Sequence, residues 1–207
     1  MVRPGTITSR LIALNVLVFL AEVAKGDVLL ARFALWPLGR FYVPELGTVV
    51  GFHLPQLLTY AFLHAGVIHL FLNMFALRIF GRDVEAALGA TRYLILYVAA
   101  VLSAGVTQLL VLAAVEGDPF PTIGASGGVF GVLLAFGTLY PRRIVTLVFP
   151  PIPMPAWLFV VLYGAVELAQ GVFGTQAGVA HFAHVGGMIG AWVVLRSWRR
   201  ETVGAAW

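Results

Sequence analysis

The chain has 207 residues, of which 60% are hydrophobic and only 11% are charged, and its mean hydropathy is +0.96. A water-soluble domain of this size could not bury so much apolar surface, so the composition indicates a membrane protein. The sequence contains no cysteine, which excludes disulfides, thiolate metal ligands and a cysteine nucleophile.

The net charge of +4 comes from thirteen basic residues that form no single patch. Most of them stand in short clusters between apolar stretches, namely Arg3 with Arg10, Arg78 with Arg82 and Arg92, Arg142 with Arg143, and Arg196 with Arg199 and Arg200. This arrangement follows the positive-inside rule of membrane topology. We therefore expect the charge to reflect orientation in the bilayer, and no nucleic-acid partner.

Crossing about 30 Å of hydrocarbon takes roughly 20 apolar residues, and six stretches approach or exceed that length. They cover residues 9–24, 54–79, 92–115, 124–140, 155–173 and 180–197. An even number of crossings, with basic clusters near both ends, puts both termini on the cytoplasmic side. The sequence predicts an all-α polytopic membrane protein, a six-transmembrane-helix bundle that forms one domain over residues 1–207.

One long connection, residues 25–53, separates the first two spans. It combines several aromatic side chains with Arg and Pro and carries few charges. Aromatic residues of this kind favour the headgroup region of a bilayer. We expect this loop to lie in or on the outer leaflet.

Polar side chains inside a span are costly, so each is a candidate for function. They are His64, His69 and Asn73 in the second span, Ser126 in the fourth, and His181 and His184 in the sixth, while Glu22 and Glu167 are the acidic residues within the spans. Counting about 1.5 Å per residue from the nearest Arg cluster places Ser126, His184, His69 and Asn73 in one layer of the outer half.

The fourth span is short, and Pro119 and Pro121 oppose its extension toward the outer surface. Its N-terminus should therefore lie below that surface, beside Ser126, where free N–H groups and the positive end of the helix dipole suit an oxyanion. Irregular backbone at this depth is tolerated where it lines a water-filled cavity.

Pairs of glycines four residues apart favour close helix crossing beside two of these polar residues. Gly127 and Gly131 follow Ser126, and Gly186 and Gly190 follow His184. Close crossing of the fourth and sixth spans would bring the serine hydroxyl to an imidazole that can accept its proton, as nucleophilic catalysis requires.

Three segments together resemble one known family. FLHAGVIHLFLNM contains His69 and Asn73, GASGGVFG contains Ser126, and AHVGGMIG contains His184. In this order, with GRDVEAALG after the second span, the chain resembles the rhomboid family of intramembrane serine proteases over essentially its whole length.

The resemblance implies that Ser126 is the nucleophile and His184 its general base, as a dyad without an aspartate. The backbone N–H of Ser126 and the side chains of His69 and Asn73 would form the oxyanion site. Supporting roles fall to Gly124, Gly127, Phe130 and Gly187, with Phe130 stacked under the His184 ring and Gly187 permitting close helix contact. The implied substrates are transmembrane segments of other proteins, cleaved without a cofactor or metal.

Two positions leave the resemblance incomplete. Pro55-Gln56 stands where many members have Trp-Arg, which puts the anchoring of the first loop in doubt. Glu167 lies in the outer half of the fifth span, so a contact with His184 stays open. The dyad that the resemblance implies predicts that Glu167→Gln retains most activity.

Alternatives come from other classes of protein. A haem or metal protein could use His64, His69, His181 and His184 as ligands, and a relative without activity could bind membrane clients on the same fold. The absence of an Arg- and Ser-rich presequence favours a bacterial cytoplasmic membrane over an organelle. The sequence leaves the oligomeric state open.

Overall fold

The computed structural model describes residues 5–114, 120–147, 150–173 and 180–204. Arg3 and Pro119 lie outside this part, as do the side chains of Arg199 and Arg200. The helices are α1 (Ile7–Phe33), α2 (Gln56–Thr59), α3 (Val67–Ala76), α4 (Arg82–Leu88), α5 (Ala90–Ala114), α6 (Ser126–Leu139), α7 (Ala156–Phe173) and α8 (His181–Gly204). Shorter helical segments are η1 (Pro44–Leu46), η2 (Tyr60–Phe62) and the π-helical η3 (Leu77–Gly81).

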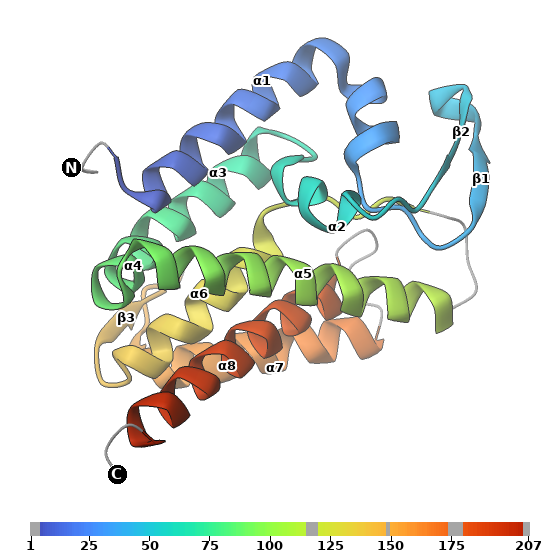
Figure 1. The fold of residues 1–207 in the computed structure, drawn as a ribbon. Coiled ribbons are helices and arrows are strands. Elements are labelled where there is room, and N and C mark those ends of the chain that lie inside the picture. Colours follow the sequence, from blue (N-terminus) through green and yellow to red (C-terminus); the bar gives the residue numbers. More distant parts are fainter. Residues whose placement is uncertain (1–4, 115–119, 148–149, 174–179, 205–207) are drawn as a thin grey trace.

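The predicted all-helical architecture is correct for the bundle, but two small hairpins accompany it. β1 (Arg40–Val43) pairs antiparallel with β2 (Thr48–Gly51), and β3 (Ile144–Thr146) pairs with β4 (Pro153–Pro155). The start of α1 and the end of α8 lie at one end of the bundle, and the β1–β2 hairpin lies at the other (Figure 1). This arrangement is the one that the predicted even number of crossings would produce.

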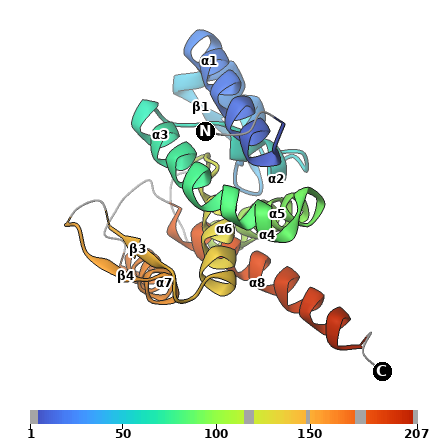
Figure 2. The ribbon, with the colours of Figure 1, turned by 90° about the vertical axis from the view of Figure 1, so that its left-hand side faces the viewer.

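Helix α6 occupies the centre of the molecule, in contact with α3, η3, α5, α7 and α8 (Figures 1 and 2). It is apolar on every face, and every residue from Gly127 to Leu133 is buried. A helix that is hydrophobic all round belongs in the interior. Ser126, the first residue of α6, is therefore surrounded by other helices.

Outward-facing side chains of the peripheral helices are large and apolar. Val23 on α1, Ile68 on α3 and Phe173 on α7 are each about three-quarters exposed, at 75%, 75% and 76%. Contiguous apolar exposure on this scale suits a lipid environment. The protein is an integral membrane protein.

Helix lengths give fewer membrane-spanning helices among the described residues than the six that the sequence pattern predicts. Among the described residues, Ile7–Phe33, Ala90–Ala114 and Ala156–Phe173 are long and apolar enough to span a membrane, and the bent pair Gln56–Phe62 with Val67–Leu88 adds a fourth if counted as one. With 14 residues, α6 is shorter still than expected. The count of six crossings stays a prediction.

The second predicted span, residues 54–79, is wrong as one continuous helix. The chain turns by 100° between Gln56–Phe62 and Val67–Leu88. The Glu22 carboxylate accepts the His64 N–H at the bend, at 3.0 and 3.2 Å, and α3 begins after Gly66. The Glu22 carboxylate on α1 thus accepts a backbone N–H that has no partner within a helix.

The first loop is more ordered than the sequence suggested. Helix α1 breaks at Lys25, whose φ and ψ are −145° and 40°, and then continues to Phe33 before the β1–β2 hairpin. The helix thus bends next to residue 24, where the first span was predicted to end, and continues into the segment predicted as a loop.

Gln56 anchors this loop in place of the Trp-Arg pair. Its buried side chain accepts the N–H groups of Trp36 and His53, at 3.4 and 3.1 Å, and donates to the carbonyl oxygens of Arg32 and Gly51, both at 3.3 Å. Gln56, one of the two residues that replace Trp-Arg, therefore holds the first loop in place through these four hydrogen bonds.

Candidate active site

Ser126 is the first residue of α6, and its backbone is positioned by the preceding glycine. Gly124 has φ of +123°, a conformation that other residues rarely adopt. A Cβ at Gly124 would also lie 2.8 and 2.9 Å from Cε1 and Nε2 of His69. The Gly124 N–H donates to the Tyr60 carbonyl oxygen at 3.0 Å. Glycine is therefore required here both by conformation and by the approach of the imidazole.

The loop that delivers Ser126 is also tied to the first loop. Leu35 and Thr122 form an isolated antiparallel bridge through two backbone hydrogen bonds of 2.9 and 3.0 Å. Both residues are buried. The long first connection thus supports the serine from outside the helix bundle.

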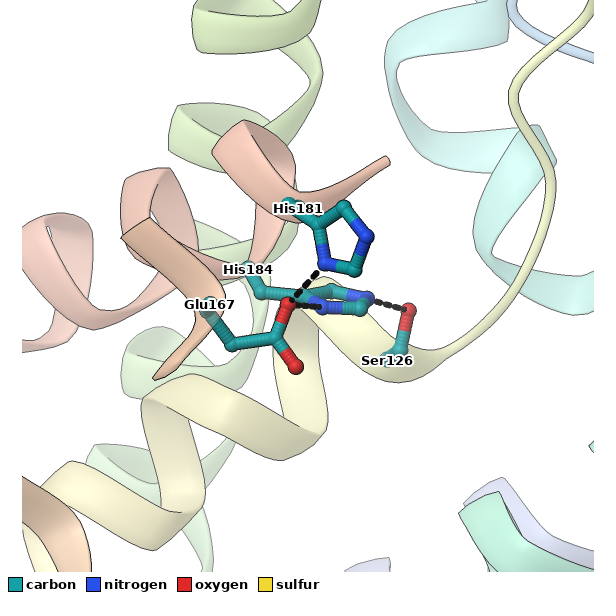
Figure 3. A network of polar contacts seen from close by, with 4 residues as sticks. All are labelled: Ser126, Glu167, His181 and His184. Atoms are coloured by element: carbon teal, nitrogen blue, oxygen red, sulfur yellow. Dashed lines mark hydrogen bonds and ion pairs between the residues drawn. The ribbon is translucent and has the colours of Figure 1, made fainter. Parts of the chain in front are cut away.

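His184 lies in the first turn of α8, facing Ser126. Its Nε2 is 2.8 Å from the serine Oγ, a hydrogen-bonding distance (Figure 3). Phe130, one turn along α6 from Ser126, stacks on the His184 ring with centroids 4.4 Å apart and planes within 5°. The predicted stack is present, so the ring is held on one face by Phe130 and at one nitrogen by Ser126.

The crossing of α6 and α8 depends on Gly127 and Gly187, where the close helix contact that the resemblance implied for Gly187 is present. A Cβ at Gly187 would run into the carbonyl oxygen of Gly127. Gly186 and Gly190 instead face α5, where a Cβ on them would meet Thr107 and Ser103. Consecutive residues on a helix lie on different faces. Gly187 therefore permits the close crossing of α8 with α6, and Gly186 the close crossing of α8 with α5.

His69 and Asn73 line the same cavity as Ser126. The Ala65 N–H donates to Nδ1 of His69 at 3.3 Å, which leaves the ring's proton on Nε2, the nitrogen near Gly124. Asn73 donates one of its two amide hydrogens to the His69 carbonyl oxygen at 2.9 Å. The two residues are four apart on α3 and so share one face of the helix. Both side chains keep a donor for the cavity.

The cavity is about 1060 Å³ and extends along α6 from Ser126 toward the opposite end of the helix. Polar groups line both ends of the cavity, with Ser126 and His184 at one and the Asp83–Arg143 ion pair at the other, and apolar side chains from α3, α6 and α7 line most of the length between them. α3 and α7 stand on either side of α6 (Figure 2). The site can therefore hold an extended, largely apolar chain with its reacting bond at the Ser126 end.

Glu167 on α7 closes the polar cluster. Its Oε2 lies 2.7 Å from Nδ1 of His184 and 2.7 Å from Nδ1 of His181, and all three side chains are buried (Figure 3). Sequence reasoning left the Glu167 contact open and gave His181 no place in it. The available signals were a lone acid in an apolar span and a second histidine one turn before His184.

The four histidines of the haem or metal alternative are not gathered into one ligand set. In the part of the chain that the structure describes, the group of three or more side chains with clustered ligand atoms is Glu167, His181 and His184, within 4.8 Å of one another. His64 and His69 form a separate ring pair 5.1 Å apart. In this cluster the Glu167 carboxylate lies within hydrogen-bonding distance of both imidazoles.

Comparison with known proteins places the chain in a family. The Rhomboid domain matches residues 51–199. Rhomboid protein 1, mitochondrial, of Saccharomyces cerevisiae is 31% identical over 201 residues, covering 94% of this chain and 53% of the yeast protein. RHOMBOID-like protein 6, mitochondrial, of Arabidopsis thaliana is 30% identical over 190 residues, covering 80% and 56%. Rhomboid protease GluP of Bacillus subtilis is 32% identical over 129 residues, covering 62% and 23%.

The chain spans about half the length of the first two of these relatives, or 53% and 56%. Both are named as mitochondrial, so the names do not support the bacterial cytoplasmic membrane that the sequence suggested. One relative is named a protease, and the Rhomboid domain match covers all four catalytic and oxyanion candidates. The chain therefore belongs to the rhomboid family.

Proposed function

We propose that the protein is an intramembrane serine protease that cleaves peptide bonds in or near transmembrane segments of other proteins. The observation that carries this proposal is the 2.8 Å contact between Ser126 Oγ and His184 Nε2 inside a cavity with donors on its opposite wall. A serine hydroxyl is a weak nucleophile until a base accepts its proton. His184 is buried and Ser126 is partly buried, so the nitrogen that would accept the serine proton lies beside the hydroxyl inside the helix bundle.

In the proposed reaction, Ser126 Oγ bonds to the carbonyl carbon as its proton passes to Nε2 of His184. The carbonyl oxygen becomes an oxyanion, which the Ser126 N–H, His69 Nε2–H and the Asn73 amide stabilise. The His184 imidazolium then protonates the leaving amine. Water, deprotonated by the same nitrogen, releases the acyl-enzyme and restores the serine.

The apolar length of the cavity supports a hydrophobic polypeptide as substrate. A peptide bond inside a regular helix is shielded by its own hydrogen bonds, so the segment must unwind near Ser126. Helix-destabilising residues near the scissile bond would favour that unwinding. By the resemblance to the rhomboid family, small residues are preferred near that bond. The proposed orientation, with both termini on the cytoplasmic side, puts Ser126 in the outer half of the bilayer.

Cleavage of a transmembrane reporter in liposomes tests the proposal. Wild type should cleave it, Ser126→Ala and His184→Ala should not, and Ser197→Ala on the exposed part of α8 should match wild type. Folded wild type that binds the reporter without cutting it would favour the client-binding alternative. A Ser126→Ala variant that still cleaves would refute the assignment of the nucleophile.

A further inference from the structure

One buried carboxylate oxygen lies between two imidazoles at the proposed site. Oε2 of Glu167 is 2.7 Å from Nδ1 of both His181 and His184. In Figure 3 the three side chains and Ser126 form a continuous chain of contacts from α7 through α8 to α6. The carboxylate thus meets His184 at the nitrogen opposite the one that faces the serine.

This contact selects the tautomer of His184. An ionised carboxylate accepts hydrogen bonds and cannot donate, so Nδ1 of His184 carries the proton. The neutral ring then has its lone pair on Nε2, 2.8 Å from Ser126 Oγ, and can accept the serine proton. With the proton on Nε2 instead, the ring could not act as a base toward Ser126.

Among the contacts on the ring in the described part of the chain, the Glu167 contact alone makes that selection. Phe130 fixes the plane of His184 by stacking but does not distinguish its two nitrogens. Among the described residues, the hydrogen-bond partner of Nδ1 is Glu167. Stacking and the carboxylate therefore have separate effects: one sets the plane of the ring, the other its rotation and protonation.

His181 holds the carboxylate in turn. It donates from Nδ1 to the same oxygen and is buried, with 4% of its surface exposed. Its Nε2 is buried and has no hydrogen-bond partner within the described structure. A neutral His181 is consistent with that environment, because a second protonated nitrogen would be left without an acceptor.

We propose that Glu167 is a positioning residue of this protease, holding His184 with its proton on Nδ1 and stabilising the imidazolium that forms when Ser126 attacks. The inference rests on the proposed function. Glu167 stays ionised throughout: the proton moves from Ser126 Oγ to Nε2 of His184 and then to the leaving amine. His181 orients Glu167. Glu167→Gln therefore impairs the enzyme, contrary to the expectation from a dyad.

A purely structural role would tie α7 to α8 without affecting the chemical step. The two roles differ in which kinetic constant they change. Loss of positioning lowers kcat and leaves KM nearly unchanged, since the substrate segment lies along the apolar part of the cavity. Loss of a helix tie lowers the melting temperature and the fraction of folded enzyme.

The experiment measures kcat and KM for reporter cleavage by folded wild type, Glu167→Gln, His181→Gln, Ser126→Ala and the control Glu45→Gln, whose acid is exposed in η1. Melting temperatures are measured in parallel. We expect Glu167→Gln to lower kcat at least about 100-fold with KM changed by less than about twofold. His181→Gln should lower kcat less, and Glu45→Gln should match wild type.

A second measurement uses the wild-type chain and does not depend on the folding of a variant. Proton NMR of protein labelled with ¹⁵N-histidine and inhibited by a serine-directed phosphonate should show one strongly deshielded imidazole N–H on His184, from its charge-assisted bond to Glu167. If that signal is absent, or if folded Glu167→Gln keeps wild-type kcat, the inference is overturned.

The outcomes also separate this inference from the proposed function. One outcome is that wild type cleaves, Ser126→Ala does not, and Glu167→Gln cleaves normally. That outcome would support the protease assignment and refute the positioning role of Glu167. If folded wild type neither cleaves the reporter nor reacts with the phosphonate, both the protease assignment and the role of Glu167 are refuted.

Discussion

The carbonyl oxygen of Gly127 on α6 lies directly against Gly187 on α8, in the turns that carry Ser126 and His184. No side chain fits between these backbones, because a Cβ at Gly187 would overlap the Gly127 carbonyl group. The distance between the two helices, and with it the 2.8 Å contact between Oγ and Nε2, therefore depends on the absence of one methyl group.

Gly187→Ala should separate the helices and nearly abolish cleavage. Overpacking of this kind costs about 1–3 kcal/mol of stability, and a displacement of about 1 Å at the reacting atoms costs about 100-fold in rate. Gly26→Ala is the control, because a Cβ there meets nothing within 4 Å. Cleavage and melting temperature are compared for both. Wild-type cleavage by Gly187→Ala would show that the crossing does not set the catalytic distance.

Asn73→Ala should lower kcat by about 100- to 1000-fold, the usual effect of removing one oxyanion donor. The substitution also removes the bond from Asn73 to the His69 carbonyl oxygen. Asn15→Ala is a matched control, since Asn15 makes the same kind of bond to its own helix, to Leu11 O at 2.8 Å, and does not line the cavity. Similar kcat losses in the two variants would assign the effect to the helix rather than to the oxyanion.

Gln56→Ala should destabilise the first loop by about 2–3 kcal/mol, because it leaves buried backbone groups without partners. Gln56→Glu should be worse, since a carboxylate cannot donate to the carbonyl oxygens of Arg32 and Gly51. Thermal unfolding monitored by Trp fluorescence reports both, as Trp36 is buried beside Gln56. If both variants melt with wild type, Gln56 does not anchor the loop.

Removal of metal ions should leave cleavage unchanged. The Glu167, His181 and His184 cluster satisfies its Nδ1 hydrogens internally, without a cation. Dialysis against a chelator, followed by an activity assay and by metal analysis of the untreated protein, checks this. Activity that disappears on dialysis and returns with zinc would support the metal alternative instead.

Sequence reasoning selected its candidate residues because the chain is so apolar, and the structure brings the four of them to one cavity. Ser126, His184, His69 and Asn73 are conspicuous among residues that prefer lipid, and helical spacing was enough to put the last two on one face. The resemblance added the stacking of Phe130, which depends on side-chain direction and is confirmed at 4.4 Å.

The errors came from contacts between segments distant in sequence. Periodicity cannot distinguish residues 54–79 as one helix from a bent pair, because the bend is stabilised by Glu22 on α1. It also cannot tell which neighbour a small residue faces, so Gly186 and Gly190 were assigned to α6 rather than α5. The partners of Glu167 likewise depend on how α7 packs beside α8, which hydropathy does not encode.

The central claim, that His184 activates Ser126, is tested most directly by the site and rate of phosphonate labelling. Folded protein is incubated with a serine-directed phosphonate, digested and analysed by mass spectrometry, for wild type and His184→Ala. We predict a single modified serine, Ser126, in wild type and labelling at least about 100-fold slower in His184→Ala. Labelling at another serine, or equal rates in the two proteins, would contradict the account.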